Sequence, residues 1–114
     1  MNDQRVKLLH SLLDLEKPTS QIVPSLNACG WDSDRELLTL TRHEIAMVMR
    51  RYLNNQLSAK EVEEWANAIE GREDVGYESD FERLLDEAIY QLANPVLTLP
   101  LSHQVAKEWL KQLS

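Results

Sequence analysis

The side chains of this chain that could carry out chemistry include three histidines, one cysteine and 19 carboxylates. Metal sites in helical bundles use a Glu three residues before an inward-facing His, and none of His10, His43 and His103 has a Glu at that distance. His43-Glu44 begins like the helix of a zinc protease, but Met47 stands where the second His is needed. We therefore predict no metal site and no cofactor.

Nucleophilic catalysis has no recognisable motif in this sequence. Cys29 lies in a loop beside Gly30, and we interpret it as a small buried apolar residue rather than a reactive thiol. Three glycines are too few for a phosphate-binding loop or a dinucleotide fingerprint. One catalytic alternative stays open, a small-molecule enzyme that uses Glu82 and Asp86, which lie four residues apart on one helix face. Our prediction is that the chain is not an enzyme.

The negative charge is concentrated in the middle of the chain. The formal net charge is −7, and residues 61–87 alone contain eleven acidic and two basic residues. Such a surface repels phosphate backbones and anionic membranes, so we predict no direct binding to nucleic acid and no membrane binding. A run of acids is also typical of a solvated helix face that only keeps a protein soluble, and this alternative stays open.

The spacing of these acids favours a binding role. They do not alternate with Lys four residues on, as a self-paired helix surface would, and several surround Tyr77. Unpaired carboxylates around an aromatic side chain suit a basic protein partner, with the tyrosine as a central anchor. The residues that we predict to contact the partner are Glu63, Asn67, Glu70, Glu73, Asp74, Tyr77, Glu78 and Asp80.

Helices must position these residues, because apolar side chains recur every three or four positions through most of the chain. We predict helices over residues 4–16, 42–53, 59–70, 80–93 and 103–113, and a short sixth helix around Ser25 stays open. Three of the helices begin at a capping box, in which Ser or Thr pairs with a Glu three residues on. These boxes start at Thr41, Ser58 and Ser79, Ser102 caps the last helix, and Gly71 ends the third.

The predicted fold class is all-α, a single compact bundle of five to six short helices over residues 1–114, because no segment has the β-branched alternation of a strand of convincing length. The connection at 54–57 predicts that helices 42–53 and 59–70 form a central antiparallel hairpin. Trp65 and Trp109 lie on apolar stripes and are expected in the core.

Two segments lack a clear helical pattern. Pro24 and Gly30 interrupt residues 19–38, where the candidate core anchors are Ile22, Val23, Leu26 and Trp31. Near the C-terminus, leucines alternate with other residues, which predicts an extended linker laid across the core. These leucines are Leu97, Leu99 and Leu101.

Part of the sequence resembles a group of small, acidic, helical bacterial proteins that are largely uncharacterised. The stretches that carry the resemblance are YLNNQLS at 52–58 with Trp65-Ala66 after it, REDVGYE at 72–78 and LANP at 92–95. Some of these proteins look like immunity proteins of contact-dependent or polymorphic toxins. The resemblance covers residues 40–113, and it implies binding and blocking of a cognate toxin domain, typically a basic nuclease whose active site an acidic patch can occupy.

We therefore expect a cytoplasmic, acidic protein-binding module, most simply an immunity or antitoxin-like inhibitor that occludes a basic partner such as a toxin nuclease. The location follows from the lack of a signal peptide, of an apolar run of roughly 18 to 20 residues and of a second cysteine. The alternative function is an adaptor or subunit of a larger bacterial assembly, which uses an apolar helix face. Salt distinguishes the two, because only the first depends steeply on ionic strength.

Overall fold

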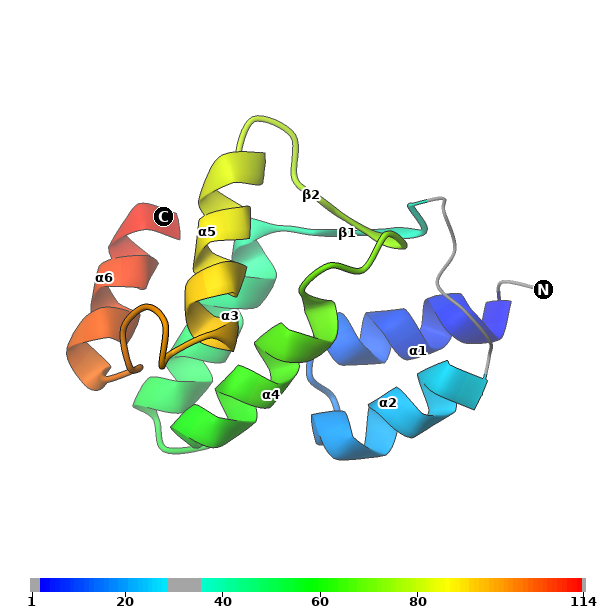
Figure 1. Cartoon of the computed structure of the whole chain (residues 1–114), viewed down its shortest axis with the longest axis horizontal. Coiled ribbons are helices and arrows are strands. Elements are labelled where there is room, and N and C mark those ends of the chain that lie inside the picture. The colour runs from blue at the N-terminus through cyan, green and yellow to red at the C-terminus, as the bar shows by residue number, and fades with distance from the viewer. Residues whose placement is uncertain (1–2, 29–35, 114) are drawn as a thin grey trace.

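The structure, a computed structural model, describes residues 3–28 and 36–113. These residues contain six helices and two short strands (Figure 1). This confirms the all-α fold class, whereas Cys29 and Trp31 lie outside the described residues. The elements in chain order are α1 (Asp3–Leu13), α2 (Thr19–Ala28), β1 (Leu38–Leu40), α3 (Arg42–Leu53), α4 (Ala59–Ile69), β2 (Val75–Tyr77), α5 (Glu82–Ala93) and α6 (His103–Leu113).

The helices pack mainly in pairs: α1 with α2, α4 with α5, and α3 with α6. Figure 1 shows α1 and α2 at one end of the long axis and α6 at the other. The two helices of the predicted hairpin, α3 and α4, are joined by the short connection at 54–57, but their most extensive contacts are with α6 and α5 rather than with each other. No helix among residues 3–28 and 36–113 is long and apolar enough to cross a bilayer.

A single hydrophobic core draws on all six helices and confirms the apolar stripes. Its largest side chain, Trp65 of α4, is fully buried, and its indole Nε1 donates to the backbone oxygen of Leu12 at 2.8 Å. The indole of Trp109 donates to Gln91 Oε1 at 2.6 Å, which joins α6 to α5. Both tryptophans are therefore core residues with their one polar atom satisfied.

Two of the three predicted capping boxes form. Thr41 and Glu44 cap α3 in both directions, and the backbone amide of Thr41 donates to Glu44 Oε1 at 2.7 Å. Ser58 and Glu61 do the same for α4, with bonds of 2.9 and 3.1 Å. These local signals succeed because all of their partners lie within four residues.

The third predicted capping box, at Ser79, is wrong. Helix α5 begins only at Glu82, its N-cap residue is Phe81 without a side-chain cap, and Asp80 has a left-handed φ of 72° that the first turn of a helix does not allow. A tertiary contact overrides the local signal, because the Arg42 guanidinium lies 3.7 Å from the centroid of the Phe81 ring. The start of α5 is thus fixed against α3 rather than by Ser79.

The weak pattern between residues 19 and 28 hides a complete helix, so the short sixth helix is confirmed and is longer than the prediction. Pro24 lies inside α2, where it removes one backbone donor. Ile22 and Leu26 are buried as predicted and Val23 is half-buried, which attaches α2 to the core despite the proline.

The strands were not predicted from sequence. β1 and β2 pair in parallel, with Leu38 opposite Val75 and Leu40 opposite Tyr77. Each is only three residues long, which is too short for an alternating pattern to show. Their pairing places the loop before α5 against the chain that leads into α3.

Candidate binding surface

Asp74, predicted to contact a partner, is a buried structural residue. Its carboxylate has no exposed surface and accepts two parallel bonds from Arg72, Nε to Oδ1 at 2.9 Å and Nη2 to Oδ2 at 3.0 Å. Arg5 of α1 adds a third, Nη1 to Oδ2 at 3.3 Å. The backbone oxygen of Asp74 also accepts the amides of Leu37 and Leu38 at the start of β1. Asp74 therefore ties α1 to both strands and has no surface to offer a partner.

Glu78 is also paired within the fold. Arg42, the first residue of α3, donates to it from the backbone amide at 3.0 Å, from Nε at 3.1 Å and from Nη2 at 3.2 Å. These hydrogen bonds hold the pKa of the Glu78 carboxyl below its ordinary value. The prediction that the loop at 72–80 carries unpaired carboxylates is thus wrong for Asp74 and Glu78, although Glu73 and Asp80 are exposed.

Tyr77, the predicted anchor, is half-buried in β2 rather than exposed. Burial raises the pKa of its phenol, and the negative charges of Asp86 and Glu70 raise it further. Glu70 follows α4 and Asp86 belongs to α5. The tyrosine side chain therefore lies within electrostatic reach of both carboxylates.

The predicted residues of α4 come together as their spacing requires. Glu63, Asn67 and Glu70 lie on one side of the helix, with Asn67 and Glu70 exposed and Glu63 half-buried. The Asn94 amide donates to Glu70 Oε2 at 3.1 Å, which connects this side of α4 to the end of α5. Neither Glu63 nor Glu70 forms an ion pair with another described residue.

Helix α5 contributes three exposed acids, Glu82, Asp86 and Glu87, which likewise have no ion-pair partner in the described part of the chain. Glu82 and Asp86, the pair considered for catalysis, are both exposed on α5. We use the term acidic surface for Glu63, Asn67, Glu70 and Asp86.

The segment after α5 does not lie extended across the core, and that prediction is wrong. The backbone oxygen of Asn94 accepts the amides of Leu97 and Thr98 at 3.1 and 3.0 Å and the Thr98 hydroxyl at 2.8 Å, which closes a turn. The turn carries Val96 and Leu97 outward with 96% and 73% of their surface exposed, and Leu99 is 48% exposed. The alternation assumed a straight chain, and this turn reverses its direction.

A groove of about 300 Å³ lies beside this turn. Leu92, Pro95, Pro100 and Leu101 supply apolar lining from the end of α5 and the segment after it, while Ala59, Lys60, Glu63 and Gln91 complete it from α4 and α5. Glu63 thus belongs both to the acidic surface and to the groove. Sequence reasoning missed this groove, because residues 59–63 and 91–101 meet only through the packing of α4 on α5.

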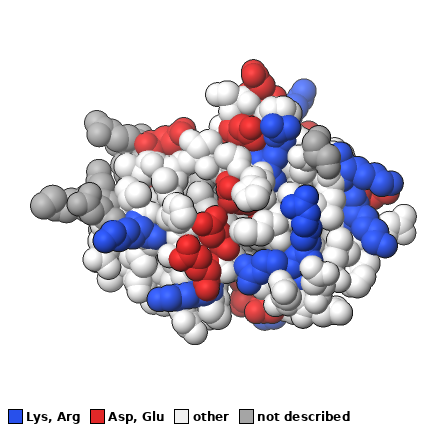
Figure 2. All heavy atoms as spheres, turned by 180° about the vertical axis from the view of Figure 1, so that it is seen from behind, with Lys and Arg blue, Asp and Glu red and all other residues white. Residues whose placement is uncertain are grey.

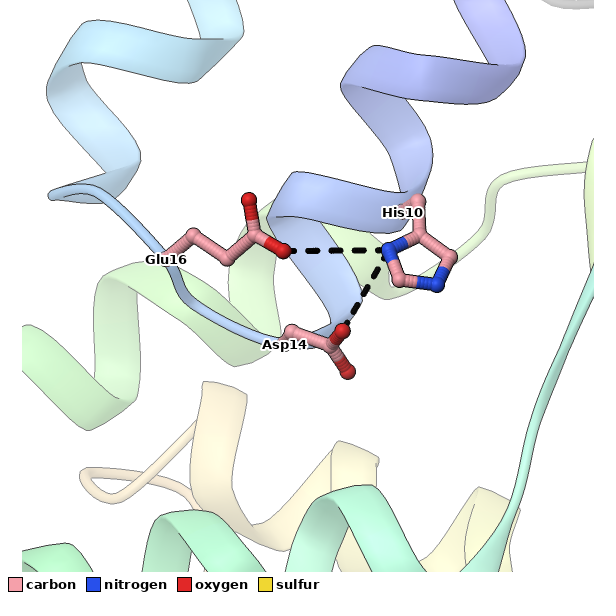
Figure 3. Close-up of side chains that lie close together, drawn as sticks. All are labelled: His10, Asp14 and Glu16. Carbon is pink, nitrogen blue, oxygen red and sulfur yellow. Dashed lines mark ion pairs between the residues drawn. The ribbon is translucent and has the colours of Figure 1, made fainter.

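His10, Asp14 and Glu16 form a second cluster that the sequence did not predict (Figure 3). His10 Nδ1 lies 3.3 Å from Asp14 Oδ2 and 3.8 Å from Glu16 Oε2, and the Ser11 hydroxyl donates to Glu16 Oε1 at 3.1 Å. Among the described residues, these three are the group whose ligand atoms lie close enough to share a metal ion. Contacts of the His10 ring nitrogen with two carboxylates at the C-terminal end of α1 account for the same geometry.

Five of the 12 Lys and Arg residues lie on α3 and α6, together with two Glu. Figure 2 shows Lys and Arg side chains over the half of the molecule that contains these helices, and a smaller number over the opposite half. The exposed charged side chains are therefore mainly acidic on α4 and α5 and mainly basic on α3 and α6.

Comparisons with protein-family models, with curated proteins and with solved structures find no match to this chain.

Proposed function

We propose that this chain is an acidic protein-binding module that recognises a basic protein, and that it acts as an immunity or antitoxin-like inhibitor of a partner such as a toxin nuclease. The observation that carries the proposal is the acidic surface, in which the carboxylates of Glu63, Glu70 and Asp86 have no ion-pair partner among the described residues. Asp74 and Glu78 have arginine partners, so the unpaired acids are the ones free to meet another molecule.

Inhibition of this kind needs no bond-making chemistry. A negative surface attracts a basic partner over about a Debye length, and at contact its carboxylates take the places of phosphate groups. The basic residues of α3 and α6 repel the same partner, so the field of the molecule turns the acidic surface toward it. The inhibitory role depends on the resemblance to immunity proteins, and the binding role depends on the surface.

The test compares two variants with the same change in net charge. E63K/E70K reverses the acidic surface, and the matched control E16K/E108K reverses two exposed acids outside it. Each protein is immobilised beside the wild type, and proteins captured from bacterial lysate are identified at about 50 mM and about 500 mM salt.

The proposal expects a basic protein on the wild type and on E16K/E108K, released at high salt and absent from E63K/E70K. Addition of the purified wild-type chain is then expected to inhibit the captured protein's activity. Capture of the same partners by all three proteins, or of partners that high salt does not release, contradicts the proposal.

The exposed turn with Val96 and Leu97 favours the second candidate, an adaptor or subunit of a larger assembly. An adaptor that docks through apolar contacts binds with little dependence on salt, which the same experiment measures.

A further inference from the structure

The turn after α5 holds apolar side chains in solvent although its backbone is well fixed. Turn tips usually carry Gly, Asn, Asp or Ser, whereas this one presents Val96 and Leu97. Three donors close on the Asn94 carbonyl, and the Thr98 hydroxyl also reaches the Gln91 carbonyl at 3.1 Å. The conformation is therefore set by polar bonds that leave the two apolar side chains on the outside, as in a contact surface.

The groove beside the turn extends this apolar surface inward. Its lining from Leu92, Pro95, Pro100 and Leu101 begins directly at the base of the turn. Val96 and Leu97 at the tip and these four residues thus form one apolar strip, exposed at one end and recessed at the other. Tyr90 of α5, 45% exposed, belongs to the same end of that helix.

Acidic residues border this strip from α4. Glu63 lines the groove itself, and Glu70 accepts the Asn94 amide at the start of the turn. Lys60 lines the groove together with Glu63, and Glu70 lies at the start of the turn through its bond with Asn94, so two acids and one base lie along the strip as a whole. An apolar strip bordered in this way matches a ligand with a row of apolar side chains flanked mainly by cations.

We propose that the strip and groove, between α4, α5 and the segment 95–101, dock an amphipathic helix with basic flanks from the partner protein; this inference rests on the proposed function and names the partner's element. Such a helix presents apolar residues at intervals of three and four, which fit a groove, and its Lys or Arg residues reach Glu63 and Glu70.

Two other occupants fit the surface less well. A second copy that uses the same surface would oppose its own Glu63 and Glu70 across a twofold axis, which is repulsive. The basic helices α3 and α6 of another copy have their apolar faces buried in the core and have no apolar row to offer. An anionic bilayer is repelled by the two glutamates.

The test uses two synthetic helical peptides of roughly 18 residues as probes. Both have the same Lys positions; one has Leu and the other Ser on the opposite face. Their affinities are measured by fluorescence anisotropy for the wild type, V96S/L97S, the apolar control V96I/L97M, E63Q/E70Q, and the acidic control E82Q/E87Q at the other end of α5. Circular dichroism checks that each variant is folded, and sedimentation reports any self-association.

The inference expects the Leu–Lys peptide to bind the wild type at least about tenfold more tightly than the Ser–Lys peptide, since apolar burial adds to charge. V96S/L97S should bind the two peptides with equal affinity, because its affinity for the Ser–Lys peptide is unchanged and its preference for the Leu–Lys peptide is lost. V96I/L97M should keep the preference of the wild type for the Leu–Lys peptide. E63Q/E70Q should weaken both peptides, and E82Q/E87Q should weaken neither by as much.

The helix-docking inference and the proposed function are contradicted by different results. If V96S/L97S keeps the wild-type ratio, or the wild type self-associates and V96S/L97S does not, the helix-docking inference is overturned while the proposed function stands. If E63Q/E70Q leaves the affinity of both peptides unchanged, the proposed function fails with it.

Discussion

Two groups of carboxylates that look alike in the sequence have opposite roles in the fold. Asp74 and Glu78 lie between α4 and α5 and are paired with arginines. Arg5 of α1 and Arg72 of the same loop pair with Asp74, and Arg42 of α3 pairs with Glu78. Glu63, Glu70 and Asp86 lie on or next to α4 and α5 and have no cation partner in the described residues. Charge density therefore marks the acidic region, but the positions of arginines, two of them distant in the sequence, separate structural carboxylates from available ones.

Removal of the buried charge of Asp74 should cause the largest loss of stability. D74N leaves the guanidinium groups of Arg5 and Arg72 facing a neutral amide, and breaking a buried pair by changing one partner costs about 3–5 kcal/mol of the free energy of unfolding. Urea denaturation followed by circular dichroism measures this loss. A cost below about 1 kcal/mol would place Asp74 with the available acids and remove the distinction.

Reversal of charge on the acidic surface should reduce binding and leave the stability of the fold nearly unchanged. E63K/E70K is expected to keep the free energy of unfolding within about 0.5 kcal/mol of the wild type, because Glu70 is exposed, Glu63 is only half-buried and neither has an ion-pair partner among the described residues. The same variant should lose affinity for a basic partner, because two negative charges of the acidic surface become positive. Denaturation beside the binding assay checks both halves, and a variant that unfolds easily would show that these acids are structural after all.

Acid should weaken the loop through Glu78. Because Arg42 lowers the pKa of Glu78 in the folded chain, the contribution of this pair is complete above the unfolded value of 4.5 and is lost as pH falls through the lower folded value. Thermal unfolding of the wild type and E78Q, measured from neutral pH to about pH 3, should converge at the acid end. Parallel curves at all pH values would contradict the assigned pair.

Tyr77 lies between the two groups and should give the smallest effect. Its folded pKa is raised above 10.0, so the stability linked to its protonated form is complete below that pH and is lost as pH rises through the folded value. Y77F should therefore lose less stability than the wild type in strong alkali. The phenolate absorbance of the wild type minus that of Y77F reports the titration directly, and a value at or below 10.0 would separate Tyr77 from Glu70 and Asp86.

Sequence reasoning succeeded where partners are local and failed where they are distant. The capping boxes at Thr41 and Ser58 formed as predicted, because each is complete within four residues. The box at Ser79 did not form, because Arg42 holds Phe81 and Glu78 from 36 or more residues away.

The same reason explains the candidate site. The stripe of Glu63, Asn67 and Glu70 follows from helical spacing alone, and the structure places these residues on one side of α4. The pairing of Asp74 involves Arg5, 69 residues away, as well as Arg72, two residues away. The groove depends on the packing of α4 on α5. The turn at 94–98 depends on three donors to one carbonyl, which residue types do not specify.

The most direct test of the account is an NMR titration of the isotope-labelled wild-type chain with the basic Ser–Lys peptide, in which charge alone drives binding. The account predicts that the amide signals that move belong to the acidic surface, Glu63, Asn67, Glu70 and Asp86, while those of Asp74, Glu78 and the α3–α6 side stay in place. Shifts centred on the loop at 72–78, or spread evenly over the molecule, would show that the exposed carboxylates of α4 and α5 are not a binding surface.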